Sequence, residues 1–301
     1  MDDSVAAEWT ICSGAMCATL TARGAFLRRL THHGVDLIST FPSGTTPVMM
    51  DGAQLAPWPG RIANGRWQVD GQVHELPITE PARHNAIHGL VHALDWELVD
   101  HASDRLQLTT LLEECVGWPG AMRFELDARV ADDEFRLTLR ATNLAERPLP
   151  FGWGSHPYVR LDGTPRSAWT LEVPFDQVLA VDPDRLLPLR LEPVDAAGSD
   201  LPDLRHPHSL EGHGLDNAFT APHRDADDWW WVTVAHGDRR VRVGSPDMDW
   251  VQLYTPDDPT LLAIEPMSLG ADGFNRGPGG AGLVVLGPGQ QQAFTWAVRA
   301  G

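Results

Sequence analysis

Residues 122–130 read MRFELDARV and residues 134–141 read EFRLTLRA, two runs in which apolar and polar side chains largely alternate. A period of two is typical of a β-strand that buries one face. Residues 105–112 show the same pattern in part, and residues 229–235, 249–254 and 293–298 also have the character of strands. We therefore expect a protein built mainly from β-strands.

A hairpin is predicted at residues 66–76, RWQVDGQVHEL, where Asp70-Gly71 separates two short runs. This dipeptide favours the type I′ turn that joins two antiparallel strands. The 28 glycines and 24 prolines fit a chain with many turns. No helical periodicity lasts three turns, and the best short helix candidate is 86–94.

One domain spanning residues 1–301 is the simplest organisation, because no internal repeat or low-complexity linker divides the chain. We predict an all-β fold, a large antiparallel β-sandwich in which two sheets pack face to face. We interpret residues 187–211, which are rich in proline, aspartate and histidine, as a long surface excursion between strands.

The charge of the chain narrows the classes of partner. Its net charge is −18, which argues against binding nucleic-acid backbones or anionic membranes. All 23 basic residues are arginine, because the sequence contains no lysine. A Schiff-base lysine, a pyridoxal anchor and the lysine of a phosphate-binding loop are therefore excluded. Neutral sugars and small metabolites remain as ligands.

Three cysteines, Cys12, Cys17 and Cys115, are few and odd in number, which favours a reducing compartment over a disulfide framework. The first ten residues, MDDSVAAEWT, lack the apolar core of a signal peptide. No uninterrupted apolar run approaches the ~18 residues of a membrane-spanning helix. We expect a cytoplasmic protein.

His156 lies in FGWGSHPYVRL (residues 151–161), between small residues and a proline. A histidine presented in this way suits proton transfer, and the alternative is a histidine packed at the end of a strand. Glu265 follows an apolar run in LLAIEPM (residues 261–267). A carboxylate at the end of a buried strand points to a function or to an ion pair with an arginine.

Three further polar residues lie near glycines or turns. Arg61 in PWPGRIANGRW is either a surface arginine or a donor to ligand oxygens. His88 lies in NAIHG, and its spacing from His92 would also suit two metal ligands on one helical face. Asp216 in GLDNAFT is either a turn residue or a partner for hydroxyl groups.

Two other residue groups have alternative interpretations. His206, His208, Glu211 and His213 resemble part of a cupin metal site, but a solvated loop accounts for them better. Tryptophans are abundant, and four of them are candidates for stacking on a sugar ring: Trp58, Trp118, Trp153 and Trp250.

Together, these segments resemble the aldose 1-epimerase (galactose mutarotase) family, from about Ala18 to the C-terminus. The motifs that carry the resemblance, in chain order, are GRIANGRW with its Asp-Gly hairpin, NAIHG, PFGWGSHPY, GLDNAF and AIEPM. The resemblance implies a large antiparallel β-sandwich of the galactose mutarotase type that needs no cofactor and no metal.

The resemblance also implies roles for five residues. His156 would be the general acid and Glu265 the general base, with His88 as a second active-site histidine. Arg61 and Asp216 would bind the substrate, a free aldose such as glucose or galactose. Alternatives are a hexose-6-phosphate 1-epimerase, a non-catalytic carbohydrate-binding protein of the same fold, and a metal-dependent cupin-like enzyme. The first would need several arginines around the pocket for the phosphate, and Arg61, Arg66, Arg160 and Arg276 are available. The protein would be a monomer or a homodimer.

Overall fold

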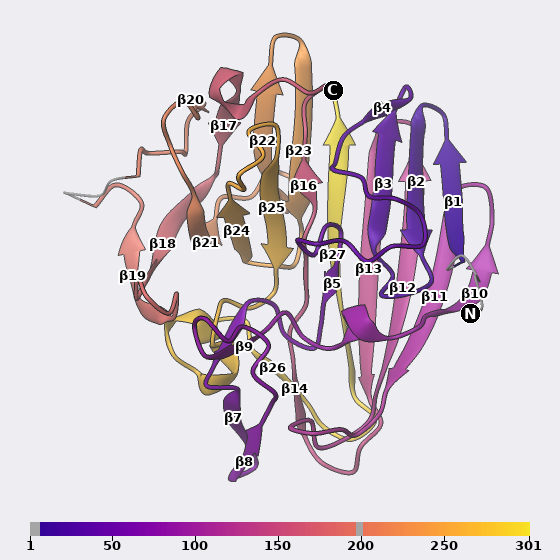
Figure 1. Cartoon of the computed structure of the whole chain (residues 1–301), viewed down its shortest axis with the longest axis vertical. Helices are drawn as coiled ribbons and strands as arrows, with labels where there is room; N and C mark the ends of the chain where they lie inside the picture. The colour runs from indigo at the N-terminus through magenta and orange to yellow at the C-terminus, as the bar shows by residue number, and fades with distance from the viewer. Residues whose placement is uncertain (1–6, 197–200) are drawn as a thin grey trace.

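The computed structural model describes residues 7–196 and 201–301, which form a β-sandwich (Figure 1). The nine-stranded sheet has the order β10 (Glu97–His101), β11 (Arg105–Leu112), β12 (Met122–Ala131), β13 (Glu134–Asn143), β27 (Gln291–Ala300), β23 (Arg239–Ser245), β22 (Trp230–His236), β17 (Thr170–Glu172) and β20 (His208–Ser209).

The eight-stranded sheet carries the strands that matter most for the site. Its order is β19 (Pro188–Pro193), β18 (Phe175–Val181), β21 (Asp216–Pro222), β24 (Trp250–Tyr254), β25 (Leu262–Met267), β15 (Gly154–Ser155) and β5 (Gln54–Leu55), with β16 (Tyr158–Val159) also paired to β25.

Smaller elements complete the described part of the chain. The four-stranded sheet contains β1 (Glu8–Ser13), β2 (Met16–Thr21), β3 (Leu27–His32) and β4 (Val35–Asp36). Three strand pairs are β6 (Arg61–Ala63) with β9 (Asn85–Ile87), β7 (Arg66–Val69) with β8 (Gln72–Glu75), and β14 (Leu149–Phe151) with β26 (Val284–Leu286). Four 3₁₀ turns are η1 (Val91–Ala93), η2 (Arg166–Ala168), η3 (Gly273–Asn275) and η4 (Pro278–Gly280).

The all-β prediction is confirmed, and the alternating runs lie where the pattern placed them. β12 and β13 pair along their whole length, with Leu126 opposite Leu139 and Ala128 opposite Leu137. These apolar residues are buried, while the charged residues between them face outwards. The core joins residues of both large sheets, so the two sheets bury their apolar faces against each other.

The predicted Asp70-Gly71 hairpin is present as β7 and β8. Both turn residues have positive φ, +50° for Asp70 and +74° for Gly71, as a type I′ turn requires. The helix suggested for residues 86–94 is absent. Strand β9 ends at Ile87, and positive φ values at His88 and Gly89 break the chain direction before η1. A side-chain period that fits a helix can therefore arise from a strand followed by a turn.

Residues 187–211 were expected to form a long surface excursion between strands, and this expectation is wrong in part. The segment contains β19, the edge strand paired to β18, and β20, which pairs with β17. Proline-rich edges of sheets are common, because an edge strand leaves one row of amide groups unpaired. Residues 197–200 of this segment lie outside the described residues.

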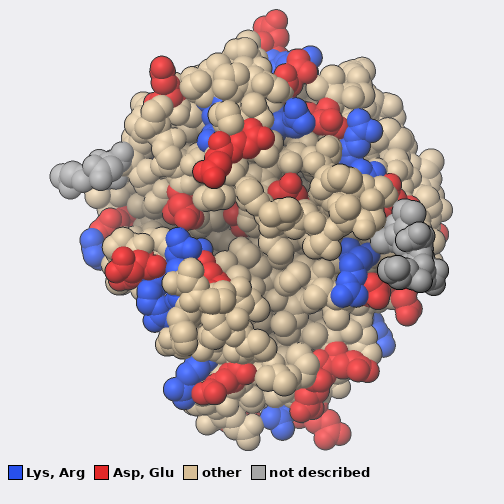
Figure 2. Space-filling model, in the orientation of Figure 1, with Lys and Arg blue, Asp and Glu red and all other residues tan. Residues whose placement is uncertain are grey.

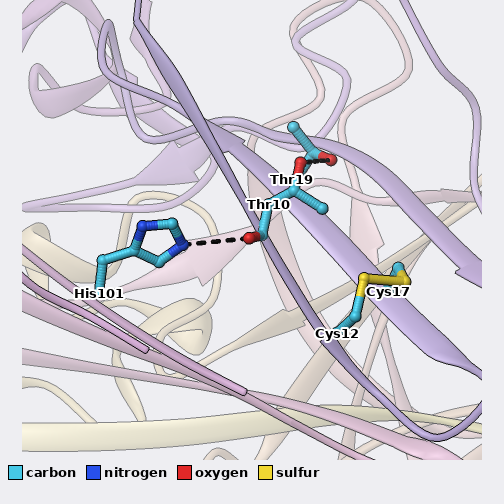
Figure 3. Close-up of a disulfide and its surroundings, with 5 residues drawn as sticks. All are labelled: Thr10, Cys12, Cys17, Thr19 and His101. Carbon is cyan, nitrogen blue, oxygen red and sulfur yellow. Dashed lines mark hydrogen bonds between the residues drawn. A yellow bond between two sulfur atoms is a disulfide. The ribbon is translucent and has the colours of Figure 1, made fainter. Parts of the chain in front are cut away.

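A disulfide joins Cys12 and Cys17, which the cysteine count did not predict. The two residues face each other across the β1–β2 hairpin (Figure 3). Next to them, the hydroxyls of Thr10 and Thr19 are 2.8 Å apart, and His101 Nε2 lies 3.1 Å from the carbonyl oxygen of Thr10. Cys115 is free and exposed. No helix in the described part of the chain has the length and apolar character needed to cross a membrane.

Candidate active site

One pocket of ≈ 220 Å³ collects all five residues singled out in the sequence: Arg61, His88, His156, Asp216 and Glu265. They come from β6, the turn after β9, the turn after β15, the start of β21 and the middle of β25. The face drawn in Figure 2 is hollowed near its centre, over the region where β24 and β25 run in Figure 1. The fold thus brings five distant motifs to one place.

His156 and Glu265 form a buried pair at this pocket. His156 Nε2 lies 3.3 Å from Glu265 Oε1, and the two side chains are only 8% and 4% exposed. The backbone of His156 is fixed on both sides: its N–H donates to the Ala53 carbonyl and its carbonyl accepts from the Gly52 N–H. These two hydrogen bonds fix the backbone of His156 and so help to keep its imidazole beside Glu265.

Close packing explains why a glycine, Gly154, stands two residues before His156. A Cβ on Gly154 would lie 2.9 Å from Pro59 Cβ and 3.0 Å from Met267 Cγ. Only glycine lets β15 approach β25 so closely that the carboxyl of Glu265 and the ring of His156 meet.

Burial dominates the electrostatics of the pair. It raises the pKa of Glu265 well above its usual value, with the nearby Asp216 adding to the effect and Arg61 opposing it. Burial also lowers the pKa of His156 to about 4. Ordinary pKa values would give an ionised glutamate that raises the pKa of a neighbouring histidine, and burial opposes both effects here. Burial thus favours the neutral form of both groups, a protonated Glu265 carboxyl beside a neutral His156 imidazole.

The ring of His88 stands edge-on to that of His156, with ring centroids 5.5 Å apart and an interplanar angle of 79°. Burial lowers the pKa of His88 well below its usual value, and the neighbouring His156 and Arg61 lower it further. His88 is therefore a neutral imidazole, which can donate through one ring nitrogen and accept through the other.

Adjacent strands place three further polar groups on the same face. Gln252 on β24 lies opposite Glu265 on β25, and Asp216 on β21 lies opposite Tyr254. The Gln252 amide donates to Asp216 Oδ1 at 2.8 Å. Burial raises the pKa of Asp216 above its usual value, while Arg61 and Arg83 oppose the shift. The wall therefore offers carboxyl and amide groups, which suit the hydroxyls of a sugar.

A family model described as aldose 1-epimerase matches residues 8–299. This chain belongs to the aldose 1-epimerase family. Among sequence relatives, the uncharacterized Escherichia coli protein YihR is 29% identical over 272 residues, covering 89% of this chain and 86% of YihR. The aldose 1-epimerase of E. coli is 30% identical over 139 residues, covering 44% of this chain and 39% of that protein.

Solved structures show the same galactose mutarotase-like fold. The GalM/aldose epimerase homologue from C. elegans superposes with a TM-score of 0.83 at 20% identity, covering 98% of this chain and 99% of that one. Galactose 1-epimerase from Lactobacillus acidophilus gives a TM-score of 0.80 at 20% identity, covering 100% and 96% of the two chains. At these identities the likeness shows the fold alone.

The aromatic residues that line the pocket are not those suggested by the sequence. Trp58, Trp118, Trp153 and Trp250 are all buried in the core, at most 2% exposed, and none lines the pocket. The aromatic lining is Tyr158 and Tyr254, which are the only two tyrosines in the chain. Two features of the sequence could have indicated these tyrosines as pocket residues: tyrosine is rare in the chain, and Tyr158 lies two residues after His156.

The metal alternatives find no support in the part of the chain that the structure describes. It holds no group of three or more histidine, cysteine, aspartate or glutamate side chains that could bind a metal ion. His88 and His92 do not share a helical face, because positive φ values at residues 88 and 89 separate them. The rings of His208 and His213 lie 5.6 Å apart without a third ligand.

The arginines proposed for a phosphate group do not converge. Of Arg61, Arg66, Arg160 and Arg276, only Arg61 lines the pocket. Arg66 forms an exposed ion pair with Glu75, and Arg276 lines a separate hollow beside the β7–β8 hairpin. A second pocket arginine, Arg83, was not singled out in the sequence.

Proposed function

We propose that this chain is an aldose 1-epimerase that interconverts the α and β anomers of a free, uncharged aldose. The observation that carries the proposal is the buried contact between His156 and Glu265 in a pocket of hydroxyl-binding groups. Mutarotation needs one base and one acid that exchange roles between ring opening and ring closure, and a proton-sharing pair supplies both.

The proton count of the pair fits the assigned roles. Transfer of its one proton from Glu265 Oε1 to His156 Nε2 yields a carboxylate base and an imidazolium acid without a proton from solvent. Glu265 then removes the proton of the C1 hydroxyl while His156 protonates the ring oxygen, and the C1–O bond to the ring breaks. After rotation about C1–C2, His156 takes its proton back and Glu265 returns one to the new C1 hydroxyl as the ring closes on the other face.

The remaining pocket groups bind and orient the sugar in this proposal. Asp216 and Gln252 accept from and donate to its hydroxyls, and Arg61 donates to its oxygens. His88, as a neutral imidazole, completes the hydrogen bonds near the reacting oxygens. Acid and base would each contribute ~10²–10⁴-fold, which suffices for a reaction that also proceeds in water.

Polarimetry tests the proposal. Freshly dissolved α-D-glucose and α-D-galactose are followed to their equilibrium rotation with and without the protein at neutral pH. A faster approach to the same final rotation supports the proposal, and the ratio of the two rates ranks the sugars. Sugar binding without any acceleration would instead support the non-catalytic carbohydrate-binding protein.

A further inference from the structure

Glu80 lies behind the arginines of the pocket without lining the pocket itself. Arg61 donates to it through both Nε and Nη2, each 3.0 Å from a carboxylate oxygen. Arg83 Nη1 donates to the same carboxylate at 3.2 Å. The side chain of Glu80 is 14% exposed and that of Arg61 is 18% exposed. The largely buried carboxylate of Glu80 therefore binds both pocket arginines.

Residues outside the pocket fix Glu80 in turn. The side chain of Asn85 is fully buried and donates to Glu80 Oε2 at 2.9 Å. Arg185, in the turn between β18 and β19, donates to Asn85 Oδ1 at 3.1 Å and to the Arg83 carbonyl at 3.1 Å. A continuous chain of hydrogen bonds thus runs from an edge hairpin of the eight-stranded sheet to the guanidinium of Arg61.

Glu80 is ionised near neutral pH. Burial alone would raise its pKa, but hydrogen bonds from Arg61 and Asn85, with the charges of Arg61 and Arg83, outweigh burial and lower the pKa. Its negative charge offsets one of the two positive charges at this wall. Its bonds also occupy Nε and Nη2 of Arg61, the edge with which a guanidinium grips a phosphate in bidentate fashion.

Resting on the proposed function, we infer that Glu80 is a positioning and specificity-determining residue: it orients Arg61 towards an uncharged sugar and keeps Arg61 and Arg83 from forming a phosphate site. Removing its charge while keeping its shape should loosen Arg61 and expose an unneutralised pair of arginines. Neutral sugars would then bind more weakly, and anions more tightly.

The test compares Glu80→Gln with the wild type in two measurements. Mutarotation of the preferred neutral sugar should show KM raised about tenfold with little change in kcat, because a charged hydrogen bond that orients a binding group is weakened. Calorimetric titration with inorganic phosphate should show affinity about fivefold higher, because the positive charge near the pocket is no longer offset.

Glu134→Gln is the matched control. Glu134 is also shared by two arginines, Arg136 and Arg299, and is 15% exposed, but it lies on the nine-stranded sheet away from the pocket. A second variant, Arg185→Ala, removes the support of Asn85 and leaves the charge of Glu80 in place. It should raise KM without strengthening phosphate binding, which separates positioning from charge.

Each outcome decides the inference. If Glu80→Gln matches Glu134→Gln in both KM and phosphate affinity, Glu80 has neither role and the inference is overturned. The phosphate titration needs no catalysis, so it still tests the specificity role if the wild type fails to accelerate mutarotation. Should Glu80→Gln not fold, an unchanged KM in Arg185→Ala, together with a crystal structure showing Arg61 unmoved, would overturn the positioning role.

Discussion

The imidazole of His156 meets the carboxyl of Glu265 with Nε2 and Oε1 3.3 Å apart, and no more than 8% of either side chain is exposed. Because both groups are buried, the environment favours the uncharged form of each. The pair therefore titrates as one unit that gains a proton in acid and loses its single proton in alkali.

Replacing either member of the pair should remove catalysis. In His156→Ala and Glu265→Ala we expect kcat to fall by about 10²–10⁴-fold, because one proton transfer loses its partner. Polarimetry measures the loss, and circular dichroism with thermal unfolding shows that the fold persists. Turnover close to that of the wild type in either variant would refute the assignment of these roles.

The pH dependence of kcat/KM should reflect the shared proton. The pKa of His156 is lowered to about 4 and that of Glu265 is raised, so the acid limb should lie well below the ordinary histidine pKa and the alkaline limb well above the ordinary glutamate pKa. The rate should fall in acid as the pair takes a second proton, and in alkali as the pair loses its only one. Polarimetry across this range, extrapolated to zero buffer, provides the profile. An acid limb centred near the ordinary histidine value of 6.5 would contradict the burial argument.

Stability should also depend on His156 in acid. Its pKa is about 6.5 when unfolded and about 4 when folded, so the unfolded state binds more protons between these values. The free energy of unfolding that depends on a neutral His156 is therefore fully present above pH 6.5. It is lost as the pH falls towards 4, by up to about 1.4 kcal/mol per pH unit. Urea unfolding of the wild type and His156→Gln at several pH values measures it; parallel curves would show that the histidine contributes nothing.

Asp216→Asn should change both binding and the pKa of the pair. Loss of the carboxylate should raise KM, because an amide nitrogen replaces one of the acceptor oxygens. The charge of Asp216 helps to raise the pKa of Glu265, so its removal should shift the alkaline limb to lower pH. Asp247→Asn is the control, since desolvation also raises the pKa of Asp247 but this residue lies outside the pocket. An unmoved limb would show that Asp216 does not act on Glu265.

The Cys12–Cys17 disulfide should stabilise the first hairpin without affecting catalysis. The loop that it closes is short, so the chain-entropy model gives about 2 kcal/mol. Denaturant unfolding of Cys12→Ala/Cys17→Ala should therefore show a lower free energy of unfolding by about this amount, with KM unchanged because neither cysteine lines the pocket. Mass spectrometry before and after reduction establishes whether the bond is present in the purified protein.

The sequence singled out the residues of the candidate site that have distinctive neighbours. His156 and Glu265 stand next to prolines, and Arg61 and His88 stand next to glycines that turn the chain. These neighbours can be recognised without a structure, because glycine permits and proline restricts backbone conformations in known ways. The strands were equally predictable, since a half-buried strand has a period of two.

Contacts between strands could not be predicted in this way. Gln252 belongs to the site only because β24 pairs with β25 in a register that puts it opposite Glu265. Glu80 holds Arg61 only because β6 and β9 pair and bring the turn at residues 80–85 beside it. Cys12 and Cys17 face each other because of hairpin register, which the number of cysteines does not reveal. Register depends on the whole sheet and not on local residue types.

The confinement of both tyrosines to the pocket has a practical consequence. Tyr158 is 2% exposed, and burial, with Glu265 and Asp51 nearby, raises the pKa of its phenol far above its usual value, so it resists reagents that need a phenolate. Tyr254 is partly exposed. Nitration or iodination of phenols would therefore modify Tyr254 and leave Tyr158 unmodified, which places one modified tyrosine in the pocket, where its absorbance would report the binding of a ligand.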